Sequence, residues 1–229
     1  MYGNNLIIDD VIPWGKTFQE HQLFFNLNEA DLDKNIACFG DGASSINAEL
    51  TQLGKKVTSF DPIYQFRATE LESRFLYILK QFTVQVDQVG NDEKSIIDEV
   101  VSCRKKATQE FLKDFDSGKK RERYIPHLLP NRIAFKDNYF DLSLISHFLL
   151  LYDHMGLDFH IQSVIEIMRV SKELRIFPTI NLYGKESSVL NELIKYLTTS
   201  QYTVEFVPID YKFNRPGMEM LKINRPEVW

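Results

Sequence analysis

The sequence predicts a single α/β domain in which a mostly parallel sheet lies between two layers of helices. Apolar runs of strand length alternate along the chain with segments whose apolar residues recur at helical spacing. This alternation is typical of parallel strands joined by crossover helices. The length of 229 residues, with 44% hydrophobic and 26% charged residues, suits one large folded domain, 1–229.

The first half of the chain supplies three expected strands. A short helix is expected within 15–28, a first strand at 35–39, and a helix from Ile46 that Gly54 ends. A second strand follows at 57–61. Two helices then carry apolar stripes over 66–82 and 96–115. A polar break at 117–123 precedes a third strand at 124–129.

The second half supplies the rest of the sheet. We expect a buried strand at 141–146, a helix over 157–168, a strand at 173–177 and a helix over 189–197. Two last strands, at 203–207 and 218–223, are joined by a loop with the turn dipeptide Pro216-Gly217. This end of the chain predicts a hairpin with one strand antiparallel to the others.

Two segments exceed what the sheet needs. From Pro62 to Arg123, 62 residues separate the second and third strands, whereas a crossover needs about a dozen residues and its helix. We therefore expect a helical insertion at about 83–123. The residues before the first strand, about 1–30, are expected to form a helical lid.

Composition excludes several classes of protein. The 27 basic and 32 acidic residues give a net charge of -5, which disfavours a general nucleic-acid binder, and no dedicated nucleic-acid domain is visible. The two cysteines, Cys38 and Cys103, provide neither a disulfide framework nor zinc-ligand spacing, so no metal site and a cytoplasmic location are expected. The longest apolar stretch, at 142–152, is shorter than the ~20 residues that a membrane-spanning helix needs.

A glycine turn is the most informative local feature. Gly40, Asp41 and Gly42 lie between an expected strand and an expected helix, where glycine permits a tight turn and close approach of a ligand. Asp61 follows 19 residues after Gly42, at the end of the second strand, where a carboxylate accepts hydrogen bonds from ribose hydroxyls. An ordinary turn with Asp61 as a helix cap remains the alternative. A nicotinamide site is disfavoured because Ser45 stands where its third glycine belongs.

At this point the sequence resembles the class I S-adenosylmethionine-dependent methyltransferases. The first and second blocks of the resemblance are IACFGDGAS at 36–44 and VTSFDP at 57–62. The third and most specific is IAFKDNYFDL at 133–142, and EIMRV at 166–170 also matches. Departures are Cys38 at a usually acidic position and Ser44 in place of the third glycine.

The resemblance implies a Rossmann-like three-layer α/β/α sandwich with a seven-stranded sheet, order 3-2-1-4-5-7-6, and an antiparallel last strand. It also implies S-adenosylmethionine as cofactor, S-adenosylhomocysteine as product and a small-molecule methyl acceptor. The oligomeric state stays open. The implied cofactor-binding residues are Gly40, Asp41, Gly42, Asp61, Pro62, Ile63, Leu128, Leu129 and Ser146.

Residues after the fourth strand are candidates for catalysis. His147 is the candidate base, because its ordinary pKa of ~6.5 suits proton transfer near neutral pH. Its alternative role is to order the loop. The candidate acceptor pocket comprises Trp14, Phe18 and Tyr152. A non-catalytic S-adenosylmethionine-binding protein and an RNA or protein methyltransferase remain alternative functions.

Overall fold

A seven-stranded sheet forms the centre of the protein in the computed structural model, which describes residues 12–86, 91–210 and 219–225. The strand order is β3-β2-β1-β4-β5-β7-β6, as predicted. Neighbouring strands are parallel except that β7 runs antiparallel to β5 and to β6. The strands are β1 Asn35–Phe39, β2 Lys56–Phe60, β3 Tyr124–Ile125, β4 Phe140–Ser146, β5 Ser171–Phe177, β6 Thr203–Pro208 and β7 Glu219–Asn224.

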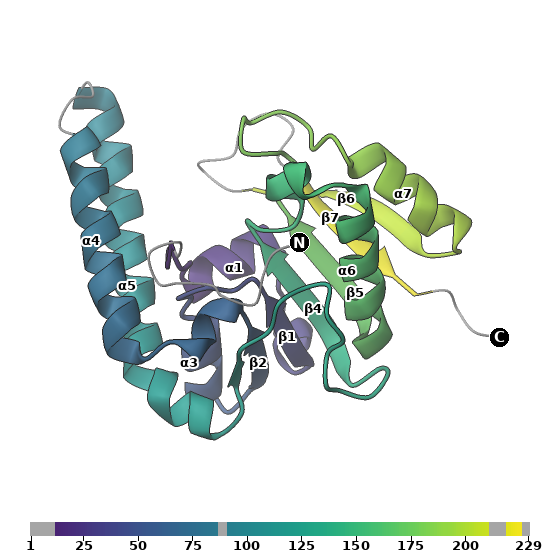
Figure 1. The fold of residues 1–229 in the computed structure, drawn as a ribbon, viewed down its shortest axis with the longest axis horizontal. Coiled ribbons are helices and arrows are strands. Elements are labelled where there is room, and N and C mark those ends of the chain that lie inside the picture. Colours follow the sequence, from purple (N-terminus) through teal and green to yellow (C-terminus); the bar gives the residue numbers. More distant parts are fainter. Residues whose placement is uncertain (1–11, 87–90, 211–218, 226–229) are drawn as a thin grey trace.

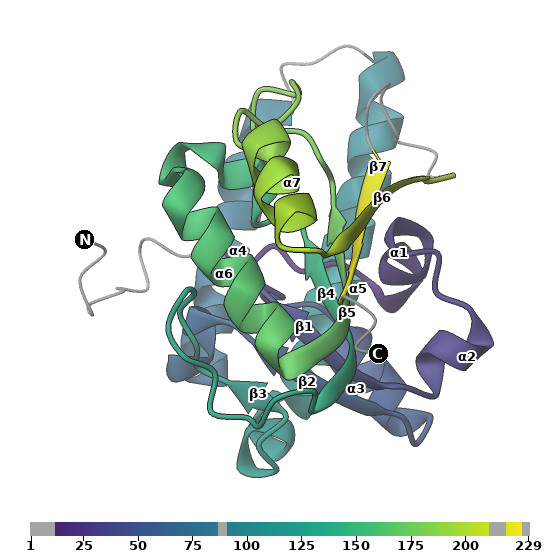
Figure 2. The same ribbon diagram turned by 90° about the vertical axis from the view of Figure 1, so that its right-hand side faces the viewer.

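Helices cover both faces of this sheet, which confirms the three-layer architecture (Figures 1 and 2). Alternate residues of β1 point to opposite faces, since strand side chains have a period of two. Ile36 and Cys38 pack in the cluster that contains helices α1 and α3, whereas Ala37 and Phe39 pack in the cluster of helices α6 and α7. The bounds are α1 Phe18–Phe24, α2 Glu29–Leu32, α3 Ile46–Gln52, α6 Leu157–Val170 and α7 Leu190–Thr199.

The insertion between β2 and β3 is a helical hairpin that projects from the sheet (Figure 1). A 3-10 helix, η2 at Pro62–Gln65, leads into α4 at Ala68–Val86, and α5 spans Asn91–Lys120 beside it. The projecting part therefore begins before the expected boundary at residue 83. At its base, Tyr64, Phe111 and Phe115 pack with Tyr124 of β3. The predicted polar break at 117–123 begins too early, because α5 continues to Lys120, with lysines in its last turn that suit a helix carboxyl end.

Two other predicted elements differ in extent. The third strand is only two residues long, and the prediction of 124–129 is wrong because β2, its pairing partner, ends at Phe60 opposite Ile125 and the chain then turns into a 3-10 helix at Pro62. The expected helix within 15–28 occupies only Phe18–Phe24, as α1, and α2 is a further short helix that was not predicted. Each starts at a capping box, on Thr17 and on Asn28. The expected turn at Pro216-Gly217 lies outside the described residues. Within the described part of the chain, no helix combines the length and apolar character needed to span a bilayer.

Candidate functional site

The turn after β1 adopts the conformation that its glycines favour. Gly40 and Gly42 have φ of +62° and +58°, in the left-handed region where a side chain is strained. A Cβ on Gly40 would lie 2.8 Å from the ring of Phe148, so this residue also needs to be glycine for space. A Cβ on Gly42 would meet nothing within 4 Å, so the backbone there is open to close approach.

Asp61 lies against this turn. One carboxylate oxygen accepts the N–H of Gly42 and the other accepts the N–H of Ile63, each at 2.9 Å. The second bond caps η2, so the helix-cap alternative is correct for this residue without excluding a ligand role. Burial raises the pKa of Asp61 to about 6, against the two backbone hydrogen bonds that lower it. The carboxylate is therefore mostly ionised at neutral pH and keeps lone pairs for further donors.

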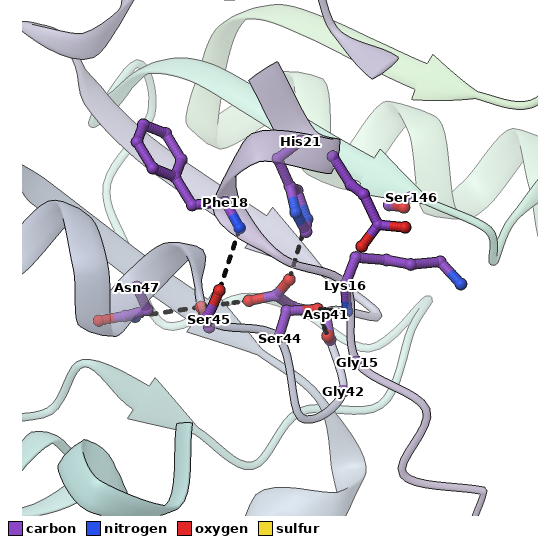
Figure 3. Close-up of polar contacts among 12 residues, drawn as sticks. Gly15, Lys16, Phe18, His21, Asp41, Gly42, Ser44, Ser45, Asn47 and Ser146 are labelled. Atoms are coloured by element: carbon purple, nitrogen blue, oxygen red, sulfur yellow. Dashed lines mark hydrogen bonds and ion pairs between the residues drawn. The ribbon is translucent and has the colours of Figure 1, made fainter. Parts of the chain in front are cut away.

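Asp41 points away from the open side of the turn (Figure 3). One of its oxygens accepts from Ser59 Oγ of β2 at 2.6 Å. The other lies 3.4 Å from Nε2 of His21 in α1, an ion-pair distance without hydrogen-bond alignment. All three residues are buried. The carboxylate of Asp41 thus ties the turn to β2 and α1, and its backbone is what remains for lining a ligand.

The segment before α1 packs directly on the glycine turn (Figure 3). The N–H of Lys16 donates to Ser44 Oγ, and the N–H of Ser45 donates to the carbonyl of Lys16, both at 3.0 Å. A Cβ on Gly15 would lie 1.9 Å from the carbonyl oxygen of Ala43. Ser44 stands where the class I methyltransferase motif has its third glycine, and here its hydroxyl binds the N-terminal segment.

A buried ion pair joins this segment to the helical hairpin. Arg104 of α5 donates to the carbonyl of Gly15 at 2.5 Å and to the carboxylate of Glu20. Glu20 also accepts the N–H of Thr17 at 2.8 Å, as part of the capping box of α1. Although burial acts to raise it, the pKa of Glu20 is lowered by Arg104 and by these hydrogen bonds. Arg104 is 2% exposed, so the pair is shielded from water.

Lys16 follows Gly15 and is half-buried beside this pair. Burial and the charge of Arg104 lower the pKa of Lys16 to about 7, although Glu20 acts to raise it. Within the described ranges, no hydrogen bond or ion pair involves Lys16 Nζ.

His147 lies directly after β4 in a left-handed conformation, with φ of +51°. Its N–H donates to the carbonyl of Phe177 at 2.6 Å, and its Nδ1 lies 2.9 Å from Ser146 Oγ. The ring packs against Phe24 and Phe177, with centroids 5.0 and 5.3 Å away. Burial, reinforced by the charges of Lys16 and Arg104, holds the pKa of His147 well below 6.5. The imidazole is therefore neutral at pH 7, and its lowered pKa makes it a weaker base than an exposed histidine.

The remaining predicted residues have different surroundings. Leu129 is buried and Leu128 is exposed, in the loop after β3. The ring of Trp14 packs on Phe75 and Phe82 of α4, at 6.1 and 5.3 Å. Phe18 belongs to the core beneath α1. Tyr152, in the 3-10 helix η3 at Leu150–Met155, is half-buried with its ring 6.0 Å from Phe148. The aromatic residues of the predicted acceptor pocket thus pack mainly against the protein itself.

Sequence reasoning missed the charged residues that surround the turn. Lys16, Glu20 and Arg104 were not predicted, because ion pairs between distant segments leave no local pattern. One signal was available, since Thr17 and Glu20 have the Ser/Thr-x-x-Glu spacing of a capping box and place a helix start beside Lys16. In the part of the chain that the structure describes, no group of three or more His, Cys, Asp or Glu side chains is arranged to hold a metal ion.

Comparison with known proteins gives one full-length relative. No family model matches the chain. The uncharacterised protein MJ0045 of Methanocaldococcus jannaschii is 33% identical over 226 residues, which cover 96% of this chain and 99% of the relative.

Solved methyltransferase structures are similar at lower identity. The mitomycin 7-O-methyltransferase MmcR is 15% identical with a TM-score of 0.49, over 91% of this chain and 53% of that protein. The chain therefore spans about half the length of the mitomycin enzyme. Magnesium protoporphyrin IX methyltransferase from Synechocystis PCC 6803, with bound S-adenosylmethionine, is 11% identical with a TM-score of 0.48, over 98% of this chain and 87% of that protein. With sequence identities and TM-scores this low, the similarity to these enzymes does not identify the activity of the chain.

Proposed function

Because the chain belongs to the same family as the uncharacterised protein MJ0045 of Methanocaldococcus jannaschii, a name that gives no activity, we propose a function from the site itself. We propose that the protein is an S-adenosylmethionine-dependent methyltransferase with a small-molecule acceptor. The strand order is the one that the resemblance to class I methyltransferases implies.

The contact between Gly42 and Asp61 carries this proposal. It joins the turn after β1 to the acidic residue after β2, at the carboxyl edge of two parallel strands, where open α/β sheets bind nucleotides. An ionised carboxylate suits the two hydroxyls of a ribose. The open space at Gly42 suits close approach of the adenosyl group. Pro62 and Ile63 follow Asp61 in η2 and would border the adenine, and Leu128 and Leu129, in the loop after β3, are the other residues that the resemblance assigns to the cofactor.

The cofactor supplies an activated methyl group on a sulfonium. The chain then needs to align the acceptor, exclude water and remove a proton from an acceptor hydroxyl or ammonium. We assign the last task to His147, because it follows β4 at the same edge of the sheet and its ring is neutral at pH 7. Ser146 orients its ring through Nδ1.

A small-molecule acceptor agrees with the local sequence. After β4 the chain reads Ser146-His147-Phe148, in place of the Asn/Asp-Pro-Pro-Tyr run of many enzymes that methylate amino groups of nucleic acids and proteins. The net charge of -5 also disfavours an RNA substrate.

Calorimetric titration with S-adenosylmethionine, S-adenosylhomocysteine and NAD tests the cofactor. We expect the first two to bind and NAD to be ignored. A second assay supplies S-adenosylmethionine with a labelled methyl group and pools of small metabolites, RNA and protein. Transfer to the metabolite pool supports the proposal. Binding without transfer to any pool indicates a non-catalytic binding protein, and failure of both adenosyl ligands to bind rejects the proposal altogether.

A further inference from the structure

Lys16 is a charged residue whose ammonium meets no hydrogen-bond or ion-pair partner among residues 12–86, 91–210 and 219–225, although its backbone is firmly held. The two hydrogen bonds to Ser44 and Ser45 fix its main chain on the glycine turn. The contact of Gly15 with Ala43 leaves no room for that main chain to shift toward the turn. The side chain therefore starts from a defined point beside the proposed ligand site.

The neighbouring charges are already engaged with one another. Glu20, the carboxylate closest in sequence, accepts from Arg104 and from both the N–H and hydroxyl of Thr17. Asp41 accepts from Ser59 and faces His21. Nothing in the described part of the chain thus supplies Lys16 with an anion of its own.

The surroundings of the side chain also favour an added anion. A half-buried ammonium near a second cation, Arg104, is destabilised by burial and by repulsion, which Glu20 opposes, and a further anion would offset the remaining cost. The charge of Lys16 is one of the causes that lower the pKa of His147, the residue that follows β4. In Figure 3 the side chain of Lys16 extends on the same side as Ser146.

We propose that Lys16 binds an anionic group, a carboxylate or a phosphate, of a ligand held at the glycine turn. The inference rests on the proposed function in placing that ligand. The anion has two sources: the carboxylate at the amino-acid end of the adenosyl cofactor, or an acidic group of the methyl acceptor. In either case a residue of the N-terminal segment takes part in binding, and that segment does more than cover the turn.

Paired ligands test the first source. S-adenosylhomocysteine carries the carboxylate, whereas 5′-methylthioadenosine has the same adenosyl group without it. We expect the Lys16→Met variant to bind S-adenosylhomocysteine about 10- to 100-fold more weakly, since hydrogen bonds to charged groups have this strength. Its affinity for 5′-methylthioadenosine should be unchanged, and Lys16→Arg should keep the wild-type preference. Lys56→Met is the matched control, because Lys56 is exposed at the opposite end of β2.

Inorganic phosphate tests the second source. If the cofactor leaves Lys16 without an anion, calorimetry on protein saturated with S-adenosylhomocysteine should show phosphate binding that Lys16→Met abolishes and Lys16→Arg keeps. Either Lys16-dependent result supports the inference and names the source. The inference is overturned if Lys16→Met, with unchanged circular dichroism and melting temperature, binds both adenosyl ligands and phosphate as the wild type does.

The two proposals fail in different ways. Wild-type protein that binds neither adenosyl ligand rejects the proposed cofactor. Phosphate binding to that free protein, lost in Lys16→Met, would still support an anion site at Lys16, and its absence would reject both.

Discussion

The N–H of Gly42 donates to the carboxylate of Asp61 at 2.9 Å, so the turns that follow β1 and β2 meet at one acceptor. The same carboxylate also receives the N–H of Ile63. Two separate backbone turns are therefore held in register by one buried side chain, which makes Asp61 the most informative position to change.

Replacing Asp61 with alanine should weaken binding of S-adenosylmethionine by about 1–3 kcal/mol, the cost of leaving the ribose hydroxyls without their acceptor. We expect the sheet to persist, because both turns keep their glycine and proline residues. Titration calorimetry measures the affinity and circular dichroism the fold. Asp116→Ala, at an exposed position on α5, is the control. Equal affinity in the Asp61 variant and the wild type would remove Asp61 from the site.

The raised pKa of Asp61 predicts how stability changes with pH. Its value rises from 3.8 to about 6 on folding. The protonated carboxyl is thus favoured by the fold, and its stabilisation is complete below pH 3.8 and lost as pH rises through 6. Relative to Asp61→Asn, the wild type should lose up to about 3 kcal/mol of unfolding free energy over this range, at 1.36 kcal/mol per unit. Urea unfolding at several pH values measures the difference, and parallel curves for the two proteins would contradict it.

Ligand affinity should depend on pH in two ways. Ribose binding needs ionised Asp61, so affinity for S-adenosylhomocysteine should fall below pH 6. Anion binding needs protonated Lys16, which faces Arg104 and Glu20 and has a pKa of about 7, so affinity should also fall above that pH. Asp61→Asn should flatten the acid side only and Lys16→Arg the alkaline side only. A profile that neither variant changes would exclude both residues from binding.

Gly15 and Gly42 should respond differently to alanine. At Gly15 the new methyl group would overlap the carbonyl of Ala43, so residues 12–25 should separate from the turn and exchange amide hydrogen faster. At Gly42 the methyl group meets open space, and only the left-handed backbone conformation opposes it, at about 1–2 kcal/mol. Hydrogen exchange and melting temperature distinguish the two. Equal effects would show that Gly15 is not a packing constraint.

Breaking the buried pair of Glu20 and Arg104 should destabilise the protein. Arg104→Met leaves the carboxylate buried without its cation, at a cost of about 3–5 kcal/mol. The double variant Glu20→Gln with Arg104→Met should lose less unfolding free energy than the sum of the two single variants, because it removes both charges of the pair and leaves no lone charge. Arg67→Met, which breaks an exposed pair with Glu70, should change little. Additive losses would mean that the pair does not act as a unit.

His147 tests the proposed chemistry. Asparagine tolerates the left-handed backbone that His147 adopts, so His147→Asn removes the imidazole with little strain. If His147 is the base, turnover should fall by about 10²- to 10⁴-fold while the affinity for S-adenosylhomocysteine is kept. A variant with wild-type turnover and an unchanged pH profile would assign His147 to loop structure alone.

The sequence predicted the features that depend on local patterns. The glycine turn and its meeting with Asp61 follow from glycine spacing and the parallel direction of β1 and β2, whereas the strand order followed from the resemblance to class I methyltransferases. The helix-cap alternative for Asp61 also proved correct, because one carboxylate serves two donors. The third strand was predicted too long because its length is set by where β2 ends, at Phe60, and the apolar run at 124–129 does not contain that information.

The charged residues around the turn were beyond prediction from one sequence. Arg104 meets Glu20 across 84 positions, and neither residue has a pattern that names the other. The role of Trp14 was equally beyond prediction. An aromatic residue near a site can pack against a ligand or against a neighbouring helix, and Trp14 packs against α4.

The long reach of these contacts has a consequence for biosynthesis. Asp31 of α2 accepts a hydrogen bond from Arg175, 144 positions later, and Glu20 of α1 accepts one from Arg104. Translation proceeds from the amino end, so both helices leave the ribosome well before either arginine has been added. Helices α1 and α2 therefore complete these contacts only after α5 and β5 have been made.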